Sequence, residues 1–218
     1  MSYRYAIYYV PKMESQLYKL GRQALGYCLY LGRPYPSASA PTEKAAVYGF
    51  HATIIAPFRT ASSRQDITDI LSSASKLLFP VNLTGLKLVG LSPGFPALAI
   101  DAGNYKLAVL ERTLLELLTE VRLPPTEDEI NKRGILTARQ MEYVQKWGYP
   151  WVLEEFRFHL TLGDIVTDPI ELKKKIATLS VIFTPKVLTS VVLDSLALCV
   201  QDKPKSYFRL DSVYELKG

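Results

Sequence analysis

The sequence predicts an α+β protein built as two related lobes, each an antiparallel sheet with helices, whose motif strands face a shared cleft. Three observations favour this fold. The chain has two histidines, and both lie in the same local pattern, about half a chain apart. A helix pattern and two strand patterns follow each histidine in the same order, which indicates a diverged internal duplication. A helical insert at about residues 105–150 separates the two halves, and we expect residues 1–218 to form a single bilobal domain.

Each histidine precedes a threonine by two positions, with apolar residues between and around them, in the segments 48–55 and 156–162. Alternate side chains of a β-strand share one face, so each strand would offer an imidazole and a hydroxyl on the same side. A single histidine in an apolar strand is more often a packing residue. Two matched copies instead favour a general acid and a general base, because the ordinary pKa of an imidazole lies near neutral pH.

The chain before the first motif contains a strand, a helix and a loop. Residues 3–10 are rich in β-formers and end at Pro11, which has no amide donor. Apolar residues recur at three- and four-residue steps from Met13 to Leu31, which predicts an amphipathic helix. The proline- and serine-rich residues 34–41 predict a flexible loop that could cover the cleft.

After the first motif, Ser62 or Ser63 can cap a helix that ends at Pro80, and residues 81–91 and 96–102 predict a hairpin. The second motif is followed by a helix from Asp168 to about 179.

After the helix that starts at Asp168, the sequence predicts strands at 187–200 and 207–216. In the insert, residues 107–122 carry a helical apolar stripe. Thr126 with Glu129 forms a capping-box pattern, and Thr137 begins a further helix that ends near residue 147.

The paired His-x-Thr motifs resemble the 2H phosphoesterase superfamily. Segments 4–8, 48–53 and 136–159 are similar to its branch associated with phosphonate metabolism, often encoded beside carbon–phosphorus lyase genes. The resemblance implies that His51 and His159 act as acid and base on either side of a phosphate, while Thr53 and Thr161 donate to its non-bridging oxygens. It implies no metal and no cofactor, and a small cyclic phosphodiester as substrate. A ribosyl cyclic phosphate in phosphonate catabolism is the favoured case.

Six further residues are candidates for substrate binding. Arg157 shares the face of His159 by strand alternation and could grip a second phosphate or a carboxylate. The tyrosines are plausible stacking groups or hydroxyl donors, and the insert is placed to carry specificity groups to the cleft. Rim ion pairs, aromatic packing and a solvated helix face are the competing explanations. The candidates are Arg157, Tyr48, Tyr149, Arg133, Arg139 and Tyr143.

The bulk composition narrows the class of protein. A net charge of +5 suits an anionic ligand, but the basic residues are not gathered in long runs, so nucleic-acid binding is permitted and not indicated. Cys28 and Cys199 have no metal-ligand spacing and are expected to be reduced and buried. The N-terminus lacks an apolar signal region, and no apolar stretch is long enough to span a membrane. We therefore expect a cytoplasmic protein without a membrane partner.

Two alternatives to a ribosyl phosphodiesterase stay open. One is processing of RNA ends that carry a 2′,3′-cyclic phosphate, in which case an RNA end would be the partner. The other is a non-catalytic protein that binds a nucleotide or phosphosugar. Intact histidine and threonine in both copies favour an enzyme, because a binding protein needs donors but not an acid and a base.

Overall fold

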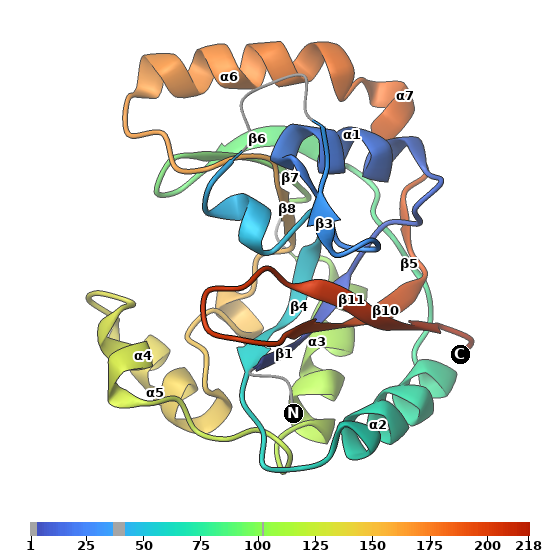
Figure 1. Ribbon diagram of the computed structural model, residues 1–218, viewed down its shortest axis with the longest axis vertical. Helices are drawn as coiled ribbons and strands as arrows, with labels where there is room; N and C mark the ends of the chain where they lie inside the picture. The colour runs from blue at the N-terminus through green and yellow to red at the C-terminus, as the bar shows by residue number, and fades with distance from the viewer. Residues whose placement is uncertain (1–3, 37–41, 102) are drawn as a thin grey trace.

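The computed structural model describes residues 4–36, 42–101 and 103–218, and its centre is a seven-stranded sheet (Figure 1). The strands are β1 (Arg4–Tyr9), β2 (Tyr27–Cys28), β3 (Arg33–Pro34), β4 (Ala52–Phe58), β5 (Val81–Asn82), β6 (Lys87–Leu91), β7 (Phe95–Ala99), β8 (His159–Thr161), β9 (Val192–Leu193), β10 (Ser195–Gln201) and β11 (Arg209–Glu215). The helices are α1 (Gln16–Leu25), α2 (Arg64–Leu77), α3 (Tyr105–Leu117), α4 (Glu127–Asn131), α5 (Ala138–Trp147), α6 (Pro169–Ile182) and α7 (Pro185–Leu188), with 3₁₀ turns η1 (Ala45–Val47) and η2 (Leu153–Glu155).

The large sheet has the strand order β11-β10-β1-β4-β8-β7-β6, and every neighbouring pair is antiparallel. The two motif strands, β4 and β8, are therefore direct neighbours near its middle, where Ala52 pairs with Leu160. The predicted α+β class with antiparallel strands is confirmed.

The predicted separate sheets of the two lobes are instead one continuous sheet. Each motif strand is followed by a helix, a two-residue strand and a hairpin, and the two-residue strands β5 and β9 pair with each other. The hairpin β6–β7 lies beside β8, and the hairpin β10–β11 lies on the side of β1 and β4. The hairpin of the first half thus pairs with the motif strand of the second half, while the hairpin of the second half pairs with β1, which separates it from β4. The duplication itself stays a prediction.

The apolar side chains of the motif strands are buried opposite the histidines. Ala52, Ile54, Leu160 and Leu162 are at most 3% exposed. Helix α3 packs against β4, α2 against β10 and β11, and α6 against β6 and β7. Burying apolar surface on the helix side stabilises the sheet and leaves the polar face of the two motifs for function.

Helix starts follow the predicted capping residues. Ser63 caps α2 and forms a capping box with Asp66. Thr126 with Glu129 caps α4, and Thr137 forms a capping box that starts α5. Each threonine or serine satisfies an amide that the first helical turn leaves without a partner.

Two predicted elements end elsewhere. The first helix stops at Leu25 and not at Leu31, because Gly26 adopts a left-handed C-cap with a φ of +73° and the chain then enters β2. The predicted strand 187–200 begins with the end of helix α7, and its extended parts are β9 and β10. The predicted covering loop includes residues 37–41, which lie outside the described residues. In the described part of the chain, no helix has the length and hydrophobicity to cross a membrane.

Candidate active site

The four motif side chains gather on one face of two adjacent strands. Continuing the Ala52–Leu160 pairing in both directions sets Thr53 beside His159 and His51 beside Thr161. On the outer sides, β1 pairs Tyr8 with Thr53 and β7 pairs Ala99 with His159. Because residues two apart on a strand share a face, both imidazoles and both hydroxyls project from the same surface.

Both histidines make the same hydrogen bond, to the backbone carbonyl two residues before them. The Nδ1 atom of His51 lies 2.9 Å from the Gly49 carbonyl oxygen, and Nδ1 of His159 lies 2.7 Å from the Arg157 carbonyl oxygen. A carbonyl oxygen only accepts, so Nδ1 carries the proton in each neutral ring and Nε2 holds the free lone pair. Nε2 is thus the basic nitrogen of each ring.

His51 lies in the more enclosed environment. Its ring stacks on Tyr8 with centroids 3.7 Å apart, and its Nε2 is 3.1 Å from the Thr53 hydroxyl oxygen, which donates to it. Burial lowers the pKa of His51 to about 4; the hydrogen bond to Gly49 opposes this shift, and the nearby His159 adds to it. At neutral pH His51 is therefore an uncharged base.

His159 has fewer neighbours. The Phe95 ring lies with its centroid 5.7 Å away, and no hydrogen bond to its Nε2 occurs among the described residues. Burial lowers the pKa of His159 as well, and the bond to the Arg157 carbonyl opposes the shift. A bound phosphate would raise the pKa of both rings, since an anion favours the imidazolium form.

Gly49 and Arg157 occupy equivalent positions, two residues before each histidine, but only one of them must be glycine. Gly49 has a φ of +69°, and a β-carbon there would lie 2.3 Å from Leu29 Cγ. Both the backbone conformation and the close packing exclude a larger residue. Arg157 faces solvent, and its guanidinium donates to the Glu154 and Phe156 carbonyl oxygens.

Asp164 ties the two motif regions together. It follows β8 by three residues, and its carboxylate accepts hydrogen bonds from the backbone amides of Glu43, Lys44 and Ala45 at 2.7–3.1 Å. Those amides open the η1 turn, which leads through Tyr48 and Gly49 to His51. The position of the first histidine is thus fixed in part by a side chain next to the second.

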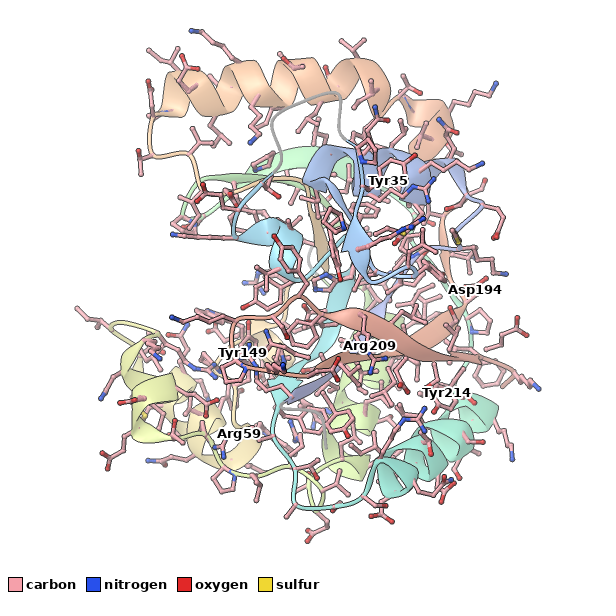
Figure 2. All side chains as sticks on the ribbon, in the orientation of Figure 1. Tyr35, Arg59, Tyr149, Asp194, Arg209 and Tyr214 are labelled. Atoms are coloured by element: carbon pink, nitrogen blue, oxygen red, sulfur yellow. The ribbon has the colours of Figure 1, made fainter. Side chains whose placement is uncertain are left out.

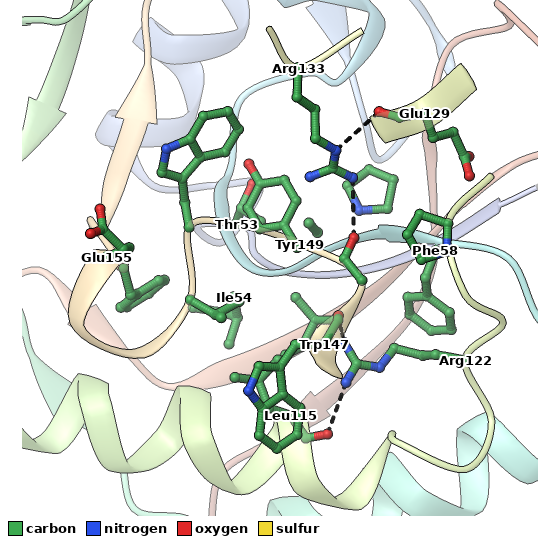
Figure 3. A pocket seen from close by; sticks show the side chains of 18 of the residues that line it. Thr53, Ile54, Phe58, Leu115, Arg122, Glu129, Arg133, Trp147, Tyr149 and Glu155 are labelled. Atoms are coloured by element: carbon green, nitrogen blue, oxygen red, sulfur yellow. Dashed lines mark hydrogen bonds between the residues drawn. The ribbon is translucent and has the colours of Figure 1, made fainter. Parts of the chain in front are cut away.

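A cavity of about 720 Å³ adjoins the motif face through Thr53 and His159. Its walls come from β4, the β6–β7 turn, the end of α3 and the segment 145–157 (Figure 3). Tyr149 and Arg59 lie beside helices α4 and α5 in Figure 2. His51 and Thr161 are not part of the cavity wall, so the cavity adjoins the end of the motif face where Thr53 and His159 lie.

The six candidate binding residues divide into three groups. Arg133, Tyr149 and Arg157 line the cavity. Tyr48 does not line the cavity, and its ring is stacked on Phe208 with centroids 5.5 Å apart.

The other two candidates do not line the cavity. Arg139 pairs with Glu142 at 3.2 Å, and the Tyr143 hydroxyl donates to the carboxylate of Glu154.

Tyr8 is a site residue that the sequence did not indicate. It is fully buried, and its hydroxyl has no hydrogen-bond partner among the described residues. Burial raises the pKa of Tyr8 well above its usual value, followed by the effects of Cys199 and Tyr48, so the phenol stays protonated. Its position on the strand 4–9 was predictable, but its contact with His51 depends on the pairing of β1 with β4.

Comparison with known proteins identifies relatives along most of the chain. A family model described as "Protein of unknown function (DUF1045)" matches residues 53–209. The chain is 31% identical over 220 residues to the ribose 1,5-bisphosphate phosphokinase PhnN of Laribacter hongkongensis (strain HLHK9), covering 95% of this chain and 50% of that protein. It is also 31% identical over 175 residues to the protein of the same name from Janthinobacterium sp. (strain Marseille), covering 74% and 38%. The chain thus spans half or less of the length of these curated relatives.

Proposed function

The chain belongs to the DUF1045 family of proteins of unknown function, and we propose that it is a 2H-type phosphodiesterase that opens a small cyclic phosphodiester. One observation carries the proposal. Two histidines with the same Nδ1-to-carbonyl bond and the same His-x-Thr spacing lie on adjacent chain segments, each beside the threonine of the other motif. Cleaving a phosphodiester needs a base, an acid and donors to the phosphoryl oxygens, and this face offers all of them.

In the proposed reaction, Nε2 of one histidine takes a proton from water while the water oxygen attacks phosphorus. The Thr161 hydroxyl donates to a non-bridging oxygen, and the Thr53 hydroxyl turns from His51 Nε2 to donate to the other as negative charge builds on them. The other histidine gives its proton to the leaving alkoxide, so the ring opens to a phosphomonoester and a free hydroxyl. His51 has the more strongly lowered pKa, which favours it as the base and His159 as the acid. This sequence of steps requires no metal ion.

The names of the relatives support a phosphorylated ribose as the sugar. Both are named for ribose 1,5-bisphosphate, and hydrolysis of a ribose 1,2-cyclic phosphate at the 2-oxygen would leave a 1-phosphate. We do not assign the phosphokinase activity to this chain, which covers at most half of either relative and contains no Gly-x-x-x-x-Gly-Lys phosphate-binding segment. The setting in phosphonate catabolism, which the 2H resemblance implies, is part of the same proposal.

A nucleoside 2′,3′-cyclic phosphate is the second candidate substrate, and one observation favours it. Trp151 is 42% exposed in the cavity wall and meets Tyr149 edge-on, with centroids 5.3 Å apart. An exposed aromatic face of this kind can stack on a nucleobase. A non-catalytic phosphosugar sensor would use the same cavity without turnover.

Initial rates on a panel of cyclic phosphodiesters, from about pH 5 to 9, test the proposal. The panel contains ribose 1,2-cyclic phosphate with and without a 5-phosphate, and the four nucleoside 2′,3′-cyclic phosphates. We expect turnover of the ribose esters, unchanged by EDTA, with a bell-shaped dependence of kcat/KM on pH. Binding without turnover of any ester would overturn the enzyme proposal and leave the sensor.

A further inference from the structure

The cavity beside the motif face carries more positive charge than a single phosphodiester needs. Five basic side chains and two acidic ones line it. Field lines concentrate in a cleft whose walls have one predominant sign, so this cavity favours a multiply charged anion. Its volume of about 720 Å³ lies within the range of small-molecule sites.

Most of the cavity's guanidinium groups already have partners. Arg122 donates from Nε, Nη1 and Nη2 to the carbonyl oxygens of Leu118, Trp147 and Leu115. Arg59 donates to the Pro124 carbonyl and lies 3.3 Å from the Glu129 carboxylate. These two arginines hold the walls together.

Arg133 differs because one nitrogen of its guanidinium makes no hydrogen bond to the described residues. Nε donates to the Glu129 carbonyl oxygen at 3.2 Å and Nη2 to the Gly148 carbonyl oxygen at 3.1 Å, as the dashed lines in Figure 3 show. Nη1 is buried and has no hydrogen-bond partner in the described part of the chain. Buried N–H groups of a charged side chain are rarely left without a partner, so Nη1 of Arg133 is a candidate donor to a bound anion.

Tyr149 lies beside the guanidinium of Arg133. The Arg133 guanidinium is 4.9 Å from the Tyr149 ring centroid, within the range of a cation–π interaction. Burial raises the pKa of Tyr149 to about 12, with Arg133 opposing the shift, so its hydroxyl is a proton donor at neutral pH. Arg133 and Tyr149 together provide a charged donor and a neutral donor in the same wall of the cavity that reaches His159.

We propose that Arg133, supported by Tyr149, forms a second anion site that binds a phosphate monoester on the same molecule whose cyclic phosphodiester lies between the two histidines. The inference rests on the proposed function. It makes Arg133 a specificity residue: a substrate with a terminal phosphate gains an interaction that the dephosphorylated analogue lacks. The phosphodiester itself stays with the His-x-Thr face.

The catalytic test compares one variant on two substrates. Arg133→Met keeps an unbranched side chain and removes the guanidinium with its charge. Arg112→Met, at an exposed arginine of α3 outside the cavity wall, is the matched control. On ribose 1,2-cyclic phosphate 5-phosphate, Arg133→Met should lower kcat/KM on the order of 10- to 100-fold, the value of a charge-assisted hydrogen bond. On the ester without the 5-phosphate the loss should be less than about threefold. Arg112→Met should act like the wild type on both.

A binding test separates failure of the subsite from failure of the proposed function. Calorimetric titration of the wild type with ribose 5-phosphate and with ribose needs no turnover. Affinity for ribose 5-phosphate that Arg133→Met removes and Arg133→Lys partly restores supports the subsite, even if no cyclic ester is hydrolysed. Equal loss of kcat/KM on both esters, or ribose 5-phosphate binding that Arg133→Met leaves intact in a folded variant, would overturn it.

Discussion

The two His-x-Thr motifs have the same internal hydrogen bonds and different surroundings. His51 is stacked on Tyr8 and accepts a hydrogen bond from Thr53, and it directly precedes the seven-residue strand β4, which pairs on both sides. His159 begins a three-residue strand, faces Phe95 at 5.7 Å and borders the cavity. The difference teaches that equal motifs are given unequal proton affinities by their neighbours, which is what an acid and a base require.

Replacing each histidine with alanine, one at a time, is the most direct test of the difference between the two motifs. We expect His51→Ala and His159→Ala each to lower kcat on the order of 10²- to 10⁴-fold, the usual value of acid or base assistance. If the roles are divided as proposed, His159→Ala removes the high-pH fall of kcat/KM and His51→Ala the low-pH rise, although the pair titrates as a coupled system. Because the two act as one unit, the double variant should lose little more than the worse single variant. Wild-type turnover by either single variant contradicts the assignment.

The two threonines test whether the motifs share the phosphoryl oxygens equally. Thr53→Val and Thr161→Val remove one donor each, and we expect losses in kcat of about 10²- to 10³-fold at most. Thr53→Val should also raise the pKa of His51, because the bond from its hydroxyl to the unprotonated Nε2 is lost. Histidine chemical shifts followed against pH by NMR measure this, with Thr161→Val as the control. An unchanged His51 pKa in Thr53→Val would contradict the hydrogen bond.

Stability against pH sharpens the comparison without a substrate. His51 has an unfolded-state pKa of about 6.5 and a folded-state pKa of about 4, so between these values the unfolded chain binds more protons. The wild type should therefore lose stability as the pH falls from about 6.5 to 4, by about 2 kcal/mol once the accessible part of the ring is allowed for. His51→Gln should remove that loss of stability, and His159→Gln should reduce it.

The buried Glu111 acts in the opposite sense. Burial raises its pKa to about 7, so the stability linked to this carboxyl is fully present at low pH and is lost as the pH rises toward 7. Because Glu111 contributes equally to the wild type and to the His51→Gln and His159→Gln variants, its effect cancels in their difference. The quantity to compare is therefore the difference in free energy of unfolding between the wild type and each variant, measured with urea at pH 7 and at pH 5. A difference that does not depend on pH would contradict the lowered pKa of His51.

The smallest expected effect concerns Tyr8, since among the described residues no ring is stacked on His159 in the same way. Tyr8→Phe keeps the stacking on His51 and removes a buried hydroxyl without a partner, so the free energy of unfolding should rise by about 1 kcal/mol. If the hydroxyl meets the substrate, kcat/KM falls in the same variant. Tyr27→Phe is the matched control. It should lower the free energy of unfolding, because the Tyr27 hydroxyl donates to the Phe208 carbonyl oxygen at 2.8 Å. Urea midpoints measure both.

Local sequence signals determined the motifs, the direction in which their side chains point and most element starts. Strand alternation placed His51 with Thr53 and His159 with Thr161, and the capping residues Ser63 and Thr137 marked two helix starts. The two cysteines are free and buried, as predicted. These features depend on residues within a few positions of one another, which is why they can be predicted from sequence.

Only the tertiary structure decided which distant segments meet. The adjacency of β4 and β8, the pairing of β7 with β8 and the stacking of Tyr8 on His51 depend on pairings between strands far apart in the sequence. Arg133 and Arg139 were equivalent candidates in the sequence, yet Arg133 lines the cavity with a free buried nitrogen and Arg139 pairs with Glu142 in solvent. Burial and the completion of hydrogen bonds made that distinction, and both are properties of the packed molecule.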